Sequence, residues 1–291
     1  MREIVVISGK GGTGKTSVVS ALAAVASPKL ILADCDVDAA DLHLIFEPEH
    51  AQSEDFFSGV KAVIDPALCI NCGICASACR FDAIKVENGQ HKVINLDCEG
   101  CGYCFELCPV QAISLPQQMV GQCHTSRTRL GFSLVHAKLG IGADNSGKLV
   151  ARVKELARET AKKEHQEYIL IDGSPGIGCP VIASLSGAHQ VLFVTEPSRS
   201  ALSDLKRVWE VTDKFRLPAL CVINKADINP AISEDIKVFL SSAGIPLAAE
   251  LPYDKDFHTA IAEGKSLPEI NQNKWRVVFE TIWTACSKEK S

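Results

Sequence analysis

The sequence predicts an α/β protein in which a doubly wound, mostly parallel sheet is interrupted by a small inserted α+β domain. Short apolar runs, typical of strands buried on both faces, alternate with helical stretches. A glycine-rich turn joins the first run to the first helix. Between about residues 58 and 116 this alternation stops, and cysteine, glycine and proline dominate.

The elements are expected in an order that builds one sheet from both halves of the chain. A βαβ unit opens the sequence, with a strand over 4–7, a helix over 16–26 and a strand over 30–33. Beyond the cysteine-rich block we expect strands over 168–171, 191–194 and 219–223, and helices over 146–162, 200–214 and 230–243. The predicted domains are therefore residues 1–58 and 118–291 for the sheet, and 59–117 for the insertion.

The composition is that of a globular protein, with 46% hydrophobic and 22% charged residues among 291. A net charge of −5 predicts no general attraction to nucleic acid or anionic lipid. The N-terminus lacks the features of a signal peptide, and no apolar run is long enough to span a bilayer. We therefore expect a cytoplasmic protein that neither binds nucleic acid nor inserts into a membrane.

The glycine-rich turn has the form of a phosphate-binding P-loop. Its glycines allow backbone N–H groups to surround phosphate oxygens, and the N-terminus of the next helix adds its dipole. Lys15 is expected to neutralise charge on the β- and γ-phosphates, and the Thr16 hydroxyl to ligate Mg²⁺. The predicted nucleotide-binding residues of this segment are Gly9, Lys10, Gly11, Gly12, Thr13, Gly14, Lys15, Thr16 and Ser17.

An extra lysine in the loop gives the sequence Lys-Gly-Gly-Thr-Gly-Lys-Thr over residues 10–16. It resembles the deviant Walker A motif of the MinD/ParA/Mrp superfamily (SIMIBI class) of P-loop ATPases, to which nitrogenase iron protein also belongs. The resemblance implies an ATPase that acts as a homodimer, in which Lys10 reaches the partner's nucleotide. Such a cation stabilises transition-state charge only when two subunits close, as an arginine finger does. Lys10 and Lys15 are thus predicted catalytic residues.

Acidic residues follow two strands of the predicted sheet. The run Asp-Cys-Asp-Val-Asp resembles the superfamily's switch I, in which an aspartate positions the attacking water. We expect Asp36 in this catalytic role, with Asp34 and Asp38 as alternatives. Asp172, followed by Gly-Ser-Pro-Gly, resembles Walker B and switch II, where a carboxylate holds the metal. The predicted magnesium ligands are Thr16, Asp36 and Asp172.

Two features of the sequence give conflicting predictions of which base the bound nucleotide carries. The segment over 224–227 has the form Asn-Lys-x-Asp, which reads guanine in many P-loop GTPases. The superfamily resemblance instead implies ATP, and related ATPases use this asparagine on adenine. We expect Asn224 and Asp227 near the base, with ATP favoured and GTP as the alternative. Pro252 and Tyr253 are also expected to pack near the base.

Eight of the 13 cysteines form two runs with the spacing of a bacterial ferredoxin. Short C-x-x-C loops place thiolates on adjacent irons, and the fourth cysteine of each run crosses to the other cluster. Paired zinc sites fit poorly, because zinc takes four ligands per site without this triple spacing. The predicted ligands are Cys69, Cys72, Cys75 and Cys108 for one [4Fe-4S] cluster, and Cys79, Cys98, Cys101 and Cys104 for the other.

Each cysteine run is followed by a short apolar segment, at 83–84 and at 112–113, which we expect to cover the clusters. The first run departs from the ferredoxin pattern only where Arg80 replaces the usual proline, and no ligand is lost. Two scattered cysteines, Cys123 and Cys179, are candidates for a third cluster that bridges a dimer. A small buried hydrophobic role is the more common one for such residues.

The last apolar stretch places Trp275, Val278, Phe279, Ile282 and Trp283 on one helical face. MinD ends in a membrane-binding helix, but too few Arg and Lys residues lie opposite this face to suit a membrane. We expect a terminal helix packed on the core.

The whole chain resembles MinD-superfamily ATPases with an inserted ferredoxin domain. This implies two [4Fe-4S] clusters, Mg²⁺ and ATP as cofactors. Three functions follow: ATP-driven electron donation to a partner metalloprotein, ATP-dependent assembly of an iron–sulfur or metal cofactor, or positioning with the ferredoxin as a docking module. Stably chelated clusters are poor cargo, which favours electron transfer. The missing membrane helix counts against positioning.

Overall fold

The computed structural model describes residues 1–26, 28–37, 40–140 and 146–288, with the backbone alone at 50 and 51. It contains two compact units. The first unit is built from residues 1–54, 122–139 and the chain from 146 onward, and the second from residues 55–121. The exact ends of the inserted domain, 59 and 117, remain a sequence prediction.

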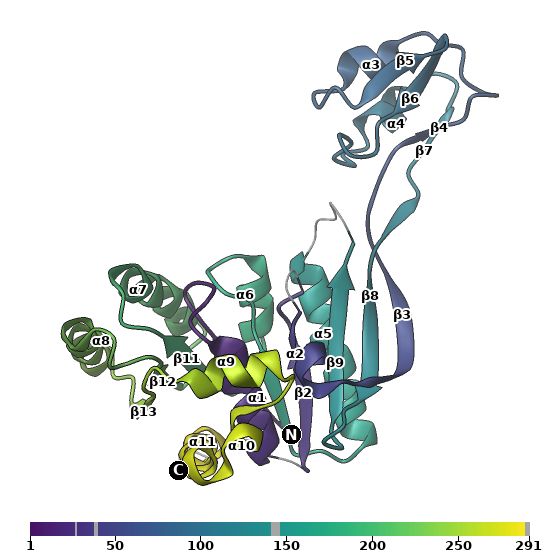
Figure 1. The fold of residues 1–291 in the computed structure, drawn as a ribbon. Coiled ribbons are helices and arrows are strands. Elements are labelled where there is room, and N and C mark those ends of the chain that lie inside the picture. The colour runs from purple at the N-terminus through teal and green to yellow at the C-terminus, as the bar shows by residue number, and fades with distance from the viewer. Residues whose placement is uncertain (27, 38–39, 141–145, 289–291) are drawn as a thin grey trace. The chain divides into compact units, whose positions relative to one another are not determined.

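One large sheet organises the first unit (Figure 1). Its order is β13-β12-β11-β1-β10-β2-β9-β8-β3, and every pair from β13 to β9 is parallel. The doubly wound, mostly parallel sheet is thus confirmed. The strands are β1 (Arg2–Ile7), β2 (Leu30–Asp34), β3 (Glu49–Val60), β8 (Gln117–Arg127), β9 (Ser133–Leu139), β10 (Tyr168–Asp172), β11 (Gln190–Thr195), β12 (Ala219–Ile223) and β13 (Leu247–Glu250).

Helices flank this sheet on both faces (Figure 1). On one face α1 packs against α10 and α11, and on the other α5 packs against α6 and the strands β2, β9 and β10. The helices of this unit are α1 (Lys15–Ala26), α2 (Leu42–Phe46), α5 (Ser146–Lys163), α6 (Cys179–Leu185), α7 (Arg199–Lys214), α8 (Pro230–Ser242), α9 (Lys255–Ala262), α10 (Leu267–Ile270) and α11 (Gln272–Ser287).

The terminal helix α11 belongs to the core, as expected. Trp275, Phe279 and Ile282 are buried and join the apolar cluster formed by β1, β2 and α1. Burying three such side chains favours folding by about 1.5–3 kcal/mol each. Among the residues that the structure describes, no helix is both long enough and apolar enough to cross a membrane.

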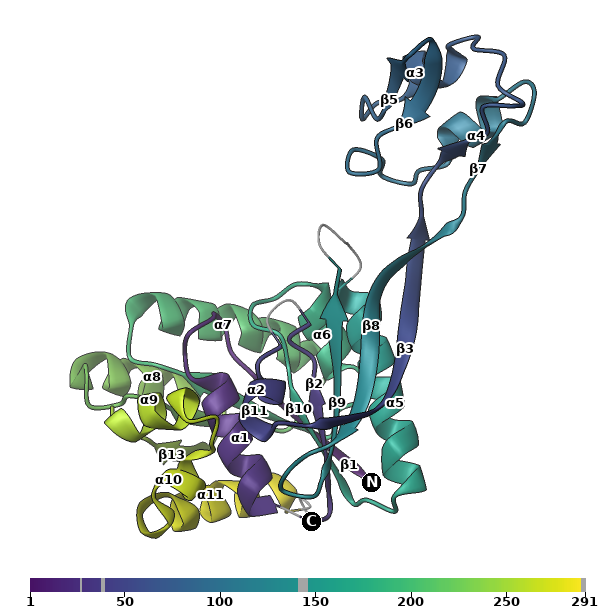
Figure 2. The ribbon, with the colours of Figure 1, turned by 45° about the vertical axis from the view of Figure 1, so that its right-hand side comes forward.

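The second unit is a small α+β domain that the chain enters through β3 and leaves through β8 (Figure 2). Its two cysteine runs form nearly identical turns. Gly73 and Gly102 precede the two helices with φ of 76° each, which favours glycine, and Cys79 and Cys108 end them with φ of −74° and −73°. Its elements are β4 (Val63–Ile64), α3 (Ile74–Ala78), β5 (Ile84–Glu87), β6 (Gln90–Val93), α4 (Tyr103–Leu107) and β7 (Ile113–Ser114).

Candidate nucleotide and iron–sulfur sites

The glycine-rich turn lies between β1 and α1, at the carboxyl edge of the sheet, where ligands of open α/β sheets bind. Gly14 has φ of 87°, and a Cβ added there would lie 2.3 Å from Asn224 Nδ2. Asn224 is buried, and its Nδ2 donates to the Thr13 carbonyl oxygen at 2.9 Å. Asn224 therefore holds the loop in place, and its contact with the base remains a prediction.

Lys15 and Thr16 both meet Asp172, at the end of β10. The Lys15 Nζ donates to Asp172 Oδ1 at 2.5 Å and to Asp36 Oδ2 at 3.4 Å. Thr16 Oγ1 donates to Asp172 Oδ2 at 3.0 Å. Burial by itself lowers the pKa of Lys15, but Asp172 and Asp36 outweigh that effect and raise it. The structure thus brings together all three predicted magnesium ligands around the Lys15 ammonium group.

The acids of the run after β2 have separate roles. Asp34 is buried and accepts hydrogen bonds from the backbone N–H groups of Asp36 at 3.1 Å and Leu42 at 3.3 Å. Burial, followed by the nearby charge of Asp172, raises the pKa of Asp34 well above its usual range. Asp34 is therefore suited to holding the loop, whereas Asp36 is only partly buried and contacts Lys15. Asp38 lies outside the described residues.

Backbone contacts join the two switch-like segments. The Cys35 N–H donates to the Asp172 carbonyl oxygen at 2.8 Å, and Ser174 Oγ donates to the Cys35 carbonyl oxygen at 2.7 Å. The Gly176 N–H donates to the Ser8 carbonyl oxygen at 2.9 Å. A displacement of either segment therefore acts on the other, and also on the backbone at Ser8, where the P-loop begins.

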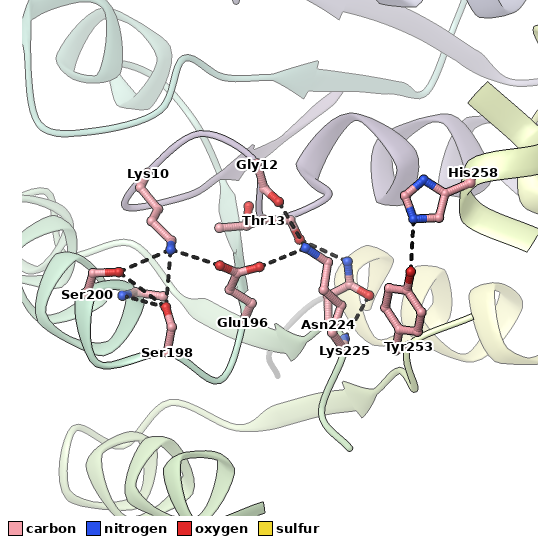
Figure 3. Close-up of polar contacts among 11 residues, drawn as sticks. Lys10, Gly12, Thr13, Glu196, Ser198, Ser200, Asn224, Lys225, Tyr253 and His258 are labelled. Atoms are coloured by element: carbon pink, nitrogen blue, oxygen red, sulfur yellow. Dashed lines mark hydrogen bonds and ion pairs between the residues drawn. The ribbon is translucent and has the colours of Figure 1, made fainter. Parts of the chain in front are cut away.

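Lys10 belongs to a polar cluster with Glu196, Ser198 and Ser200 (Figure 3). Its Nζ contacts Glu196 Oε1 at 2.8 Å and donates to Ser198 Oγ and Ser200 Oγ, both at 3.1 Å. The other Glu196 oxygen receives Lys225 Nζ at 2.8 Å. Within its own chain, the predicted trans-acting lysine is therefore paired.

The remaining base-site candidates lie around the loop after β12. Asp227 Oδ1 accepts a hydrogen bond from the Tyr253 N–H at 2.6 Å. The Tyr253 ring is about half exposed, at 51%, and its hydroxyl lies 3.3 Å from His258 Nε2. Pro252 is exposed beside it. An exposed ring next to a polar loop can stack on a base.

The loop also offers an unused polar atom to a ligand. Among the described residues, Thr13 Oγ1 is one of few buried side-chain oxygens with no hydrogen-bond partner. Buried polar atoms are rarely left unpaired. Together with the Thr16 and Asp172 oxygens, which Mg²⁺ prefers as ligands, this fits a magnesium–nucleotide complex.

In the second unit, two cavities divide the eight cysteines into two sets of four. One cavity is lined by Cys79, Cys98, Cys101 and Cys104, and its walls include Ala62, Ala83 and Ile84. The other is lined by Cys69, Cys72, Cys75 and Cys108, and its walls include Ile64, Ala112 and Ile113. These sets match the predicted ligands, including the crossed fourth cysteines, and the predicted covering segments line the cavities.

The thiols around these two cavities are candidate ligands for iron. Burial raises the pKa of Cys75 and of Cys104, the third cysteine of each run. Cys75 and Cys104 would hold iron as thiolates, so loading with iron would release their protons. When bound, [4Fe-4S] clusters supply one-electron redox chemistry.

The two candidates for a bridging cluster differ sharply. Cys123 is completely buried in the first unit, and burial raises its pKa to about 12. Cys179 is exposed at the start of α6. A buried, protonated thiol cannot reach a partner subunit, so Cys123 is a core residue.

Sequence reasoning missed Glu196 and the two serines that hold Lys10. The sequence did contain a signal, because Glu196 directly follows the buried strand β11 at the carboxyl edge of the sheet. Asp172 occupies a similar place as the last residue of β10. The signal passed unnoticed because Glu-Pro-Ser matches no phosphate or metal motif.

Comparisons with known proteins agree with this geometry. Residues 62–115 match the family model of the 4Fe-4S dicluster domain. The uncharacterized protein MJ0578 of Methanocaldococcus jannaschii is 34% identical over 92% of this chain and 91% of its own length. A ferredoxin of Pyrobaculum islandicum is 42% identical over 77 residues, which are 25% of this chain and 72% of the ferredoxin.

Two further similarities extend over half of the chain or more. A homologue of the cytosolic Fe-S cluster assembly factor NUBP2, from Nematostella vectensis, is 26% identical over 50% of this chain and 58% of its own length. The solved structure of the septum site-determining protein MinD with Mg-ADP, from Pyrococcus horikoshii, has a TM-score of 0.59 at 19% identity, covering 99% of this chain and 96% of that one. This last likeness concerns the fold alone.

Fold and site together define a P-loop nucleotide-binding protein that carries a 4Fe-4S dicluster domain. The similarity to MJ0578 covers more than nine tenths of both chains, and so includes both the fold and the dicluster domain. The chain therefore belongs to the same family as MJ0578, and it combines a MinD-like P-loop fold with an inserted 4Fe-4S dicluster domain.

Proposed function

We propose that this protein is a nucleotide-gated homodimeric ATPase that couples ATP binding and hydrolysis to electron transfer from its two [4Fe-4S] clusters to a partner metalloprotein. Lys15, Thr16 and Asp172 bind Mg-ATP, and Asp36 orients the attacking water. Lys10 of each subunit completes the partner's site. The family match to a dicluster domain supports the clusters, and the superfamily supports the ATPase.

The observation that carries the coupling is the order of strands in the sheet. β2 ends in the Asp34–Asp36 segment, and it is followed across the sheet by β9, β8 and β3. The chain enters and leaves the cluster-bearing unit through β3 and β8. Asp34 itself is the register partner of His136 on β9. Hydrogen-bonded strands thus run from the proposed switch to the strands that connect the two units.

The test is a redox titration monitored by EPR on the full, cluster-loaded protein. Asp36→Asn should bind Mg-ATP without hydrolysing it, and at least one cluster potential should then shift relative to nucleotide-free protein. Coupling requires that nucleotide states differ in their interaction with the cluster unit. Lys10→Ala should hydrolyse poorly and lose the shift. Identical potentials and identical chelator access in all states would overturn the proposal.

A second function, delivery of an iron–sulfur cluster to a client, is favoured by the similarity to the assembly factor NUBP2 homologue. The two proposals differ in where the iron ends. Incubation with an apo-ferredoxin acceptor and Mg-ATP should leave the iron on this chain if electrons are transferred. ATP-dependent loss of four irons to the acceptor would favour assembly, since a [4Fe-4S] cluster would then have moved as a unit.

A further inference from the structure

Lys10 has no N–H donor left for another ligand. A lysine ammonium has three donors, and here Glu196, Ser198 and Ser200 each accept one of them, at 2.8, 3.1 and 3.1 Å. Figure 3 shows the three acceptors converging on the Nζ atom. The pair is largely shielded, with side-chain exposures of 28% for Lys10 and 18% for Glu196. Any contact of Lys10 with a second subunit must therefore replace at least one of these three contacts.

The same carboxylate also binds a second lysine. Glu196 Oε2 receives Lys225 Nζ at 2.8 Å, and Lys225 Nζ donates in addition to the Gly12 carbonyl oxygen at 3.2 Å. Partial burial tends to raise the pKa of Glu196, but hydrogen bonds from Lys10 and Lys225 outweigh it and lower that pKa. Glu196 is therefore ionised throughout the physiological range, and through Lys225 it links the Lys10 side chain to the backbone of Gly12 in the same loop.

We propose that Glu196 is a positioning residue that retains Lys10 in its own subunit and so opposes ATP-driven dimerisation. This inference rests on the proposed function, in which Lys10 crosses to the partner's nucleotide. Lys225 connects Glu196 to the carbonyl of Gly12, in the loop that surrounds the phosphates. Rearrangement of that loop around a nucleotide then weakens the hold on Lys10.

The test is the dimer dissociation constant of the cluster-loaded full chain with saturating Mg-ATP, measured by sedimentation in an Asp36→Asn background. Glu196→Gln keeps the side-chain shape and removes the charge. Dimerisation should tighten by about three- to tenfold, because a charge-assisted hydrogen bond of a partly shielded pair is worth that order. Ser200→Ala should tighten it less. Ser198 is left unchanged because its hydroxyl also caps α7 by accepting from the Ala201 N–H.

The matched control is Glu250→Gln. Glu250 forms a comparable ion pair with Lys237 at 2.7 Å, with both side chains more than a third exposed, at 39% and 36%. Glu250→Gln removes the same charge from the same unit as Glu196→Gln, and it should leave the dimer dissociation constant unchanged. Thermal melting of each variant separates loss of fold from loss of the contact. An equal change in the control would assign the effect to net charge and overturn the proposal.

Two outcomes distinguish this inference from the function on which it rests. If Lys10→Ala dimerises as well as its parent, Lys10 does not cross and the proposed function fails. If Lys10→Ala dimerises poorly while Glu196→Gln and Ser200→Ala match their parent at unchanged melting temperature, only the role of Glu196 is wrong. Weaker dimerisation of Glu196→Gln would also overturn it, because the carboxylate would then act within the dimer.

Discussion

The nucleotide site and the cluster-bearing unit present their ligands in opposite ways. Lys15 is paired with Asp172, and Lys10 with Glu196, so the cations meant for phosphate are neutralised within the chain. The thiols of the second unit instead surround two cavities with apolar walls. A nucleotide must displace existing ion pairs, and can therefore act as a switch. A cluster completes a frame that is already built, and can therefore remain in place.

The largest effect is expected from Lys15→Met, which tests the first half of this contrast. Mg-ATP affinity should fall by at least about 100-fold, since a lysine on the phosphates is lost. The nucleotide-free protein should also lose about 3–5 kcal/mol of unfolding free energy, because Asp172 would be buried without a counter-charge. Asp172 is only 1% exposed. Calorimetric titration and urea denaturation measure the two effects.

The control is the double variant Lys15→Met with Asp172→Asn. It should recover most of the stability and none of the nucleotide affinity, because replacing both partners removes the unpaired charge. A double variant as unstable as the single one would show that the ion pair is not the cause. Wild-type ATP affinity in either variant would contradict the site itself.

Iron content tests the second half, and in particular the crossed arrangement of cysteines. Cys75→Ser with Cys79→Ser removes two ligands from one run but from different cavities. Both clusters should be lost, so that iron falls from about eight per chain toward zero. Cys75→Ser with Cys108→Ser removes two ligands from one cavity, and about four irons should remain.

The paired variants serve as each other's control, since each loses two thiols. If each run instead held its own cluster, the two iron counts would be exchanged. Zinc in the wild-type protein, or about four irons per chain, would contradict the dicluster reading altogether. Metal analysis of anaerobically purified protein measures all of these quantities.

The parts of the fold that could be predicted from sequence are those buried on both faces. The expected strands over 168–171 and 191–194 differ from β10 and β11 by no more than a residue at each end. β3, at the edge of the sheet, and its neighbour β8 were not predicted, because β8 carries polar residues such as Gln117 and Gln122 and neither strand is an apolar run. A continuous apolar run indicates a strand buried on both faces and does not mark a strand that lacks such a run.

The candidate site divides in the same way. Motif residues such as Lys15 and Asp172 are recognisable because phosphate and magnesium chemistry restricts their type and spacing. The position of Lys10 was not predictable, since its partners Glu196 and Ser200 are nearly 190 residues away along the chain. Contacts that depend on how two loops meet at a sheet edge leave no periodic or spacing signal in sequence.

A smaller effect is expected for the choice between ATP and GTP. It tests whether the residues near the base, like Lys15 and Lys10, are already engaged by partners within the chain. One Asp227 oxygen already accepts from the Tyr253 N–H at 2.6 Å. We expect ATP to bind about tenfold more tightly than GTP, about 1.4 kcal/mol, in competition titrations. Asp227→Ala should change ATP affinity by less than about threefold, because the carboxylate serves the loop rather than adenine. A GTP preference that Asp227→Ala abolishes would contradict this.

The smallest effect is expected for Cys179, the exposed thiol of the first unit. If it bound a third cluster, cluster ligands would not be confined to the cavities of the second unit. Cys123 is completely buried, and burial raises the pKa of its thiol to about 12, so both access and the thiolate form that reacts are lacking at pH 8. Iodoacetamide should therefore label Cys179, which is exposed, and leave Cys123 unmodified. Cys179→Ala should keep all of the iron, about eight per chain. A cluster shared across a dimer would contribute two irons per chain, so a loss of about two in Cys179→Ala, with Cys179 protected from alkylation in the wild type, would place a cluster in the ATPase unit after all.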